Sequence, residues 1–439
     1  MRRFHHFVLG LLGLLLLSSC GEDSGFTEPV DIPVGNVIVT NLISDSPELT
    51  VFSPSQLVGQ LHYTISSGIQ VVTPQVPVEF RVLHYANDNQ VTLMSPSITV
   101  DIDHVQNVIL SGTMAAPTTI FADNAPPDFA DGSTDALFQF VNATTSVDSM
   151  SVTLTNPQAD TQSAVVANGE VSSLLTTTGG EGLQIEVRDS ATDDLLWSSG
   201  DFAFSALTVR EFILIDYFGP GDEAVKMFTV NDLTFFSNEQ LDIAVRLANT
   251  IPDRGPIDIS VDDTVVASNL AFGEFTDYVT IPAGTNDFSV STFGDSEDII
   301  FTSTRIMIAG YFHTFAATGS GDTNSGSISV DNKRPIPSHA QFQLTNLAVS
   351  TTSVDVFLLK SGEAITETMP VSVGLTPSSF FAIEFDPGSF DLVVTTNNTE
   401  DVLFGPQRLD FEANQIYELI LTDAEGGGAP MQAIYLDGF

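Results

Sequence analysis

The residue with the clearest chemistry is Cys20, the only cysteine among 439 residues. It follows a short apolar run at residues 7–17 and the small residues Ser18 and Ser19, with two arginines near the N-terminus. This arrangement predicts a bacterial lipoprotein signal peptide at residues 1–19, which is cleaved after Ser19 before lipid such as palmitate is attached to the thiol of Cys20. The apolar run is too short to cross a bilayer and is interpreted as a targeting segment.

The residues after Cys20 indicate where the anchored protein resides. Gly21 follows the cysteine directly, whereas an aspartate at that position favours retention in the inner membrane of enteric-type bacteria. We therefore expect a cell-envelope protein tethered by lipid to the outer membrane, on its periplasmic face or at the cell surface.

A second group of residues could bind calcium, which prefers several carboxylate and carbonyl oxygens. Asp123, Asn124, Asp128 and Asp131 lie close together, and DNAP at 123–126 resembles the linker of cadherin repeats, in which calcium stiffens a rod. The other joints of the chain do not repeat the pattern in full. The alternative interpretation is an acidic, solvated linker with no cofactor.

Residues with catalytic spacing are not found. The five histidines after Cys20 form no H-E-x-x-H or other close metal pair, and the G-x-S-x-G, S-x-x-K and G-K-[ST] motifs are absent. A polysaccharide hydrolase needs two carboxylates facing each other across a cleft. A row of small sandwiches offers no obvious cleft, so we expect that the protein is not an enzyme. Trp197, the lone tryptophan, is predicted to be a core residue.

The charge balance narrows the class of partner. The chain has 13 basic and 56 acidic residues, and its net charge is −43. Cleavage after Ser19 would remove two arginines and leave a charge of −45. Nucleic acid and anionic lipid surfaces are poor partners for such a protein. With one cysteine, no disulfide forms within the chain, so packed cores must provide stability.

The strands that would position these residues recur along the chain in four internal repeats. An apolar strand ends in asparagine at Asn41, Asn142, Asn249 and Asn346, with spacings of 101, 107 and 97 residues. Each asparagine is followed by a second alternating strand, a glycine turn, an acidic turn and a long apolar strand. Alternation of apolar and polar residues is the period of a half-buried strand.

The repeats predict an all-β fold of four tandem antiparallel, immunoglobulin-like β-sandwiches. We expect these at residues 36–124, 136–232, 242–332 and 340–439, after a lipidated flexible tether at 20–35. Proline-containing polar segments between them have the composition of short linkers.

The ordered set of motifs resembles a bacterial domain of unknown function, DUF4397. The resemblance is carried best by Ile257 to Ile259, Pro282 to Gly284, Val354 to Val356 and Tyr417, in the third and fourth repeats. It implies tandem exported β-sandwich modules, often in lipoproteins. The family brings no established activity, so no catalytic residue is carried over.

Together these observations predict a non-catalytic, lipid-anchored envelope protein that displays or spaces a binding surface. Its partners would be the membrane, through the lipid, and either an envelope protein or an extracellular glycan or surface ligand. The alternatives are a periplasm-facing scaffold for another envelope protein and a polysaccharide-acting hydrolase.

Overall fold

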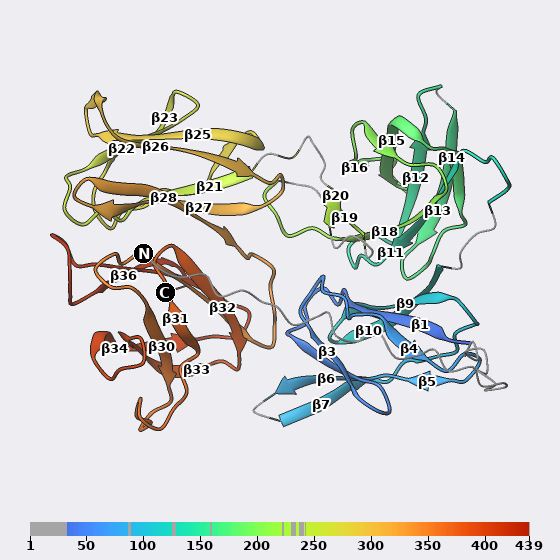
Figure 1. The fold of residues 1–439 in the computed structure, drawn as a ribbon, viewed down its shortest axis with the longest axis horizontal. Helices are drawn as coiled ribbons and strands as arrows, with labels where there is room; N and C mark the ends of the chain where they lie inside the picture. The colour runs from blue at the N-terminus through green and yellow to red at the C-terminus, as the bar shows by residue number, and fades with distance from the viewer. Residues whose placement is uncertain are drawn as a thin grey trace, which may run out of the picture.

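The computed structural model describes residues 33–86, 89–124, 129–158, 160–221, 224–229, 234–236, 241 and 243–438. These residues form strands, turns and loops, and no helix that could cross a membrane occurs among them. The strands assemble into the four β-sandwiches drawn in Figure 1, which confirms the all-β sandwich class predicted from the alternating pattern. We call them sandwiches 1 to 4 in chain order. The predicted signal peptide lies outside the described residues.

Sandwiches 1 and 2 each contain two main sheets, and sandwich 1 also has a separate two-stranded sheet. In sandwich 1 the strands are β1 (Gly35–Asn41), β2 (Leu49–Phe52), β3 (Leu57–Leu61), β4 (Gln70–Val72), β5 (Val78–Glu79), β6 (Arg81–Ala86), β7 (Asn89–Met94), β8 (Ser97–Ile98), β9 (Val105–Thr113) and β10 (Ala116–Asn124). In sandwich 2 they are β11 (Asp135–Asn142), β12 (Ser149–Thr155), β13 (Thr161–Ala167), β14 (Leu175–Thr178), β15 (Gly180–Asp189), β16 (Leu195–Ser198), β17 (Phe202–Phe204), β18 (Thr208–Asp216), β19 (Val225–Thr229) and β20 (Thr234–Phe236).

Sandwiches 3 and 4 show the shared topology without additional strands. Sandwich 3 contains β21 (Ile243–Asn249), β22 (Ile257–Val261), β23 (Thr264–Leu270), β24 (Val279–Ile281), β25 (Gly284–Thr292), β26 (Asp295–Met307), β27 (Phe312–Ser320) and β28 (Thr323–Asp331). Sandwich 4 contains β29 (Ala340–Asn346), β30 (Val354–Leu359), β31 (Ser372–Leu375), β32 (Ser379–Phe385), β33 (Gly388–Thr396), β34 (Val402–Phe411), β35 (Ile416–Thr422) and β36 (Gln432–Asp437).

All four sandwiches share one topology, best seen in sandwich 3. One sheet has the order β24-β21-β27-β28, and the other has the order β23-β22-β25-β26. In each sandwich the first strand pairs in parallel with a strand near the end of the same sandwich. The four parallel pairs are β1–β9, β11–β18, β21–β27 and β29–β35. The other pairings are antiparallel, as the sequence predicts, so the parallel pair is an addition that the strand pattern did not indicate.

The repeated asparagine has a structural role. The side chains of Asn41, Asn142, Asn249 and Asn346 are fully buried. In each, Oδ1 accepts the backbone N–H two residues further on, and Nδ2 donates to a backbone carbonyl on the third strand of the same sandwich. One carboxamide thus satisfies a donor and an acceptor where the chain leaves the first strand. The repeat signal therefore reports fold and not chemistry.

Each sandwich has its own apolar core between its two sheets. In sandwich 2, Trp197 is 1% exposed within a core that includes Phe138, Phe140 and Phe212. The predicted core role of the tryptophan is confirmed. Because the inward residues alternate along the strands, the core accounts for one face of every sheet.

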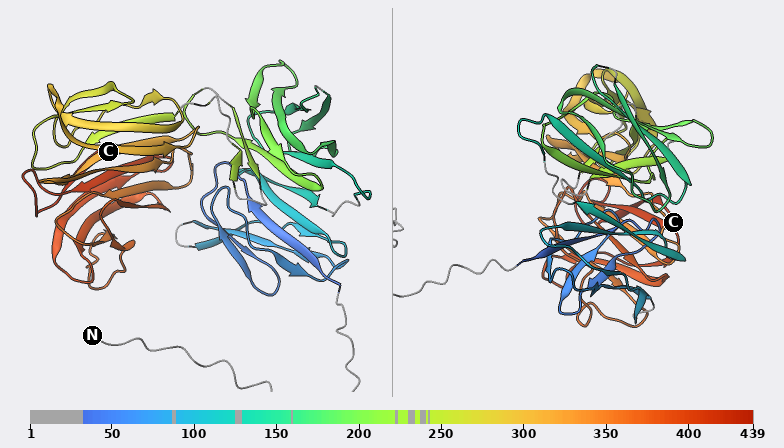
Figure 2. Two further views of the ribbon diagram at one scale, coloured as in Figure 1. Left: turned by 45° about the horizontal axis from the view of Figure 1, so that its top comes forward. Right: turned by 90° about the vertical axis from the view of Figure 1, so that its right-hand side faces the viewer.

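The outer faces of the parallel-pair sheets are also buried, because the sandwiches pack in pairs. Sandwiches 1 and 2 share a cluster in which Ile109 and Ile120 meet Ile213, Ile215 and Phe228. A second cluster in sandwiches 3 and 4 contains Ala248, Ala316, Leu347, Ile420 and Ile434. Figures 1 and 2 show the result, in which one pair lies beside the other. The array is a two-by-two block and not an extended row.

Polar groups at one register position accompany this pairing. Three residues before the anchor asparagine, Gln139 lies opposite Glu211 in sandwich 2, and Gln343 lies opposite Glu418 in sandwich 4. Across the first pair, Asn107 Nδ2 donates to Glu211 Oε1 at 2.9 Å. Across the second pair, Arg246 contacts Glu418. Each buried glutamate therefore has a partner from the neighbouring sandwich.

Candidate binding cavity

Residues of all four sandwiches line a cavity of about 450 Å³, which we call the central cavity. Its wall includes Tyr63 of sandwich 1, Phe218 of sandwich 2, Tyr311 of sandwich 3 and Ile383 of sandwich 4. Ligand sites in proteins are commonly concave, largely apolar and of about 300–1,000 Å³. The central cavity is therefore the candidate functional site.

Much of the wall from sandwich 2 is the segment 216–219, which begins at the last residue of β18. Its first residue, Asp216, accepts hydrogen bonds from the backbone and hydroxyl groups of Thr145 and Ser146 at 2.7–3.1 Å. Further on, a Cβ at Gly219 would lie 2.3 Å from the carbonyl oxygen of Gly310, which has a φ of +78°. Only glycine permits this approach of sandwich 2 to sandwich 3.

Lys226 and Tyr311 form the most distinctive contact at the cavity. The Nζ atom of Lys226, on β19, lies 3.8 Å from the centre of the Tyr311 ring just before β27. This is the geometry of a cation–π interaction. Burial lowers the pKa of the Lys226 ammonium to about 8 and raises the pKa of the Tyr311 hydroxyl to about 12. At pH 7 the lysine is still charged in largely apolar surroundings.

Arg334 links sandwiches 1 and 4 at another part of the wall. Its guanidinium donates to the carbonyl oxygens of Ser44 and Ser46 at 3.1 and 2.9 Å and to Glu384 at 3.3 Å. It also lies 4.8 Å from the centre of the Tyr63 ring. Burial lowers the pKa of Arg334 and raises that of Glu384, because both charged forms lose solvent.

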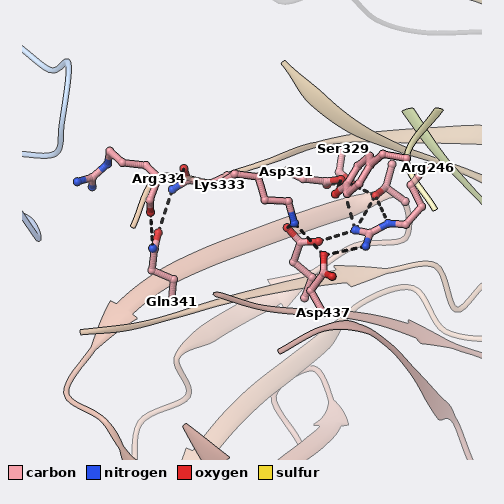
Figure 3. A network of polar contacts seen from close by, with 11 residues as sticks. Arg246, Ser329, Asp331, Lys333, Arg334, Gln341 and Asp437 are labelled. Carbon is pink, nitrogen blue, oxygen red and sulfur yellow. Dashed lines mark hydrogen bonds and ion pairs between the residues drawn. The ribbon is translucent and has the colours of Figure 1, made fainter. Parts of the chain in front are cut away.

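The segment 332–339 between sandwiches 3 and 4 is consequently not a solvated linker. Arg334, Ile336 and His339 are all buried. Asn332 donates to Gln341 at 3.0 Å, and Gln341 donates to the carbonyl of Arg334. Figure 3 shows the contact of Gln341 with Arg334 beside the larger ionic cluster. The prolines and polar residues were typical of a short linker, yet this segment is held by the contacts that surround it.

The ionic cluster adjoins the cavity at the interface of sandwiches 3 and 4. Arg246 contacts Glu418, lies 2.8 Å from Asp437 and lies 3.4 Å from Asp331. Lys333 lies 3.0 Å from Glu418 and 2.8 Å from Asp437. Figure 3 shows Arg246 and Lys333 reaching the same carboxylates from opposite sides. Three carboxylates thus share two cations.

The charge imbalance affects the protonation of this cluster. Burial, together with the nearby Asp331 carboxylate, raises the pKa of Glu418 to about 7. Asp437 is affected oppositely: although burial disfavours its charge, hydrogen bonds with Lys333 and Glu418 hold its pKa below the usual range. The cluster fits a structural role, since its members are bonded to one another across the interface.

The site residues predicted from sequence do not line the central cavity, and several of them lie outside the residues that the structure describes. Cys20, Ser19 and Asp128 lie outside the described residues, and Asn124 is described only as part of β10. Both carboxylate oxygens of Asp123 lie 3.0 Å from His104 Nδ1, and Asp131 is exposed. Within the described ranges, no three His, Cys, Asp or Glu residues gather as a metal site. The calcium hypothesis stays a prediction.

Sequence reasoning did not identify the cavity residues. One signal was present: Lys226 and Lys333 are two of only three lysines in the chain, and both line the cavity. In a strongly acidic protein, lysines this scarce are candidates for a shared location. Tyr63 and Tyr311 gave no comparable signal, because aromatic residues also fill sandwich cores.

The fold and cavity define a class of protein: a tandem array of four β-sandwiches with one topology and a cavity lined by residues of all four. Residues 243–357, which cover sandwich 3 and the first strands of sandwich 4, match the family described as Domain of unknown function (DUF4397). The resemblance predicted from the motifs is confirmed for this part of the chain.

Two other comparisons add little. No curated protein matches the chain. Among solved structures, an alignment with the Bacillus anthracis TIE protein covers 90% of this chain and 69% of that one, at 8% sequence identity and a TM-score of 0.16. A TM-score at this level carries no argument about fold or function.

Proposed function

We propose that this protein is a non-catalytic, lipid-anchored component of the bacterial cell envelope that displays a binding surface. Lipid on Cys20 would tether the chain to the outer membrane, and residues 20–35 would separate the sandwiches from it. About 15 extended residues span on the order of 50 Å. Display is favoured over spacing, because the sandwiches pack two by two.

The observation that carries this proposal is the central cavity, lined by all four sandwiches. Four sandwiches that did not pack against one another would not form such a site. Here the paired sheets, Arg334 and the Gly219–Gly310 approach bring distant segments together around one volume. We take this as support for binding.

The non-catalytic part of the proposal is supported by the carboxylates at the cavity. Asp216 accepts from Thr145 and Ser146, Asp331 accepts from Thr314 and Tyr278, and Glu384 pairs with Arg334. A hydrolase needs one carboxyl group to donate a proton and another to activate water or attack. These carboxylates already serve structural hydrogen bonds. A turnover screen on polysaccharides tests the point, and activity there would overturn it.

The test of location is protease shaving of intact cells, with antibody detection of the array and a periplasmic protein as the control. Release of the array while the control stays intact places it at the surface. Protection in intact cells, with degradation after lysis, supports the periplasm-facing scaffold and predicts an envelope partner in crosslinking. Labelling with radioactive palmitate tests the anchor directly. Cys20→Ser should abolish the label and release the protein from the membrane fraction.

A further inference from the structure

We infer that the central cavity binds a neutral, planar, fused-ring compound, held by the aromatic side chains of the wall. This inference rests on the proposed binding role and specifies the class of ligand. Three properties of the cavity support it: its volume, its aromatic side chains and the pairing of its charged groups.

The size of the cavity sets the size of the ligand. At the packing density of protein interiors, about 450 Å³ accommodates about 15 to 20 non-hydrogen atoms. A compound of three fused rings with one small substituent has this size. A nucleotide or an oligosaccharide is larger.

The wall favours a flat ring. Tyr63, Tyr217, Phe218, Tyr311 and Phe312 all line the cavity. The rings of Tyr63 and Phe218 meet edge to face at 6.1 Å across the boundary of sandwiches 1 and 2. Aromatic side chains gain edge-to-face and offset-stacked contacts with a planar ligand, beyond the burial of apolar surface. A rigid ring system also loses less conformational freedom on binding than a flexible chain does.

The carboxylates of the wall are already engaged by protein donors. Asp216, Asp331 and Glu384 each accept two or more hydrogen bonds from protein groups. A cationic ligand would have to compete with these donors for the same oxygens or leave its charge unpaired. An unpaired charge is unfavourable in largely apolar surroundings.

The cationic groups of the wall are engaged in a similar way. Lys333 and Arg334 form ion pairs with carboxylates of sandwich 4, and Figure 3 shows the side chain of Lys333 turned toward this cluster. Lys226 lies 3.8 Å from the centre of the Tyr311 ring. His62 contacts a glutamate of its own sandwich. An anionic ligand would have to displace these contacts, whereas a neutral ligand leaves them in place.

The test compares three fluorescent probes that share one ring system: the neutral anthracene-9-carboxamide, the anionic anthracene-9-carboxylate and the cationic 9-(aminomethyl)anthracene. Each is titrated at pH 7 with the chain from residue 20, carrying Cys20→Ser so that lipid and detergent are absent, and binding is followed by fluorescence anisotropy. We expect the amide to bind about tenfold more tightly than either charged probe, because burial of an unpaired charge is unfavourable. Equal or tighter binding of a charged probe overturns the inference.

Two variants with one added ring system locate the site. Ala382, on β32, is exposed at the cavity wall, and Ala382→Trp adds a large side chain there without altering charge. It should abolish binding of the amide. Ala191→Trp, at an exposed turn of sandwich 2, is the matched control and should change the affinity by less than about twofold. Amide binding that survives Ala382→Trp contradicts the assignment. Circular dichroism verifies that each variant is folded.

A further variant and an aliphatic probe test the aromatic part of the inference. Phe218→Leu keeps the wall apolar but removes a ring, so it should weaken binding of the amide about threefold or more. Phe293→Leu, which changes an exposed phenylalanine away from the cavity, should leave that affinity within about twofold. Octanamide, which is neutral and aliphatic, should compete about tenfold more weakly than the aromatic amide. An unchanged affinity in Phe218→Leu, or equal affinity of octanamide, contradicts the aromatic class.

These outcomes are separable from those of the proposed function. If no probe binds but shaving releases the array, the ligand class is wrong and display survives. If the amide binds but the array is protected, the ligand class survives and surface display is wrong.

Discussion

Asn142 offers the sharpest test of why the repeat exists. Its fully buried side chain donates to the carbonyls of Val147 and Val166, both at 3.3 Å, and accepts from the N–H and hydroxyl of Thr144 at 3.2 and 2.8 Å. Asn142→Ala deletes all four hydrogen bonds and adds none. A buried backbone group that loses its partner costs about 1–3 kcal/mol. The Val147 carbonyl still accepts a hydrogen bond from the Thr144 hydroxyl. The two backbone groups affected most are therefore the Val166 carbonyl and the Thr144 N–H. We expect a loss of about 3 kcal/mol in the free energy of unfolding.

The assay uses the only tryptophan as a local reporter. Trp197 lies in the core of sandwich 2, so its fluorescence during urea unfolding follows the sandwich that contains Asn142. Gln162→Ala is the matched control, since it removes a carboxamide that is exposed on β13. That control should cost less than about 0.5 kcal/mol. The reasoning is refuted if Asn142→Ala costs no more than the control.

Three further predictions follow from the ionic and acidic residues. Arg246→Met should lower the free energy of unfolding by about 3–5 kcal/mol in calorimetry, since buried carboxylates would lose their partner; a double variant with Glu418→Gln should recover part of that loss, and no recovery would contradict the coupling. Glu418 binds its proton more tightly in the folded state, so its contribution is present below pH 4.5 and disappears as pH rises through about 7. Relative to Glu418→Gln, the wild type should lose up to about 3 kcal/mol between pH 4.5 and 7.5 in chemical unfolding, and parallel curves would rule this out. Because Asp123 already pairs with His104, millimolar calcium should leave the melting temperature unchanged; a rise that Asp123→Ala removes would instead establish the calcium site.

Several features of this protein could be predicted from sequence because they depend on local pattern. Alternation along the strands shows which face of each sheet enters a core, and it identified the sandwich class. The anchor asparagine recurs because every sandwich must satisfy the same backbone groups at the same corner. Acylation of Cys20 is a hypothesis of the same kind, read from adjacent residues.

Tertiary structure decided what the outer faces do. The alternating period is the same for an outer face in solvent and for one packed on another sandwich, so the pattern does not indicate the pairing seen around Ile213 and Ile420. Arg334 has the sequence context of a linker residue, yet contacts with Ser44 and Glu384 make it a bridge. The central cavity exists only after both pairs form, because Tyr63, Lys226, Tyr311 and Arg334 come from segments up to 271 positions apart in the chain. The periodicity of a strand does not indicate which distant surfaces of the chain pack together. The central cavity is formed by that packing, so the sequence pattern could not predict it.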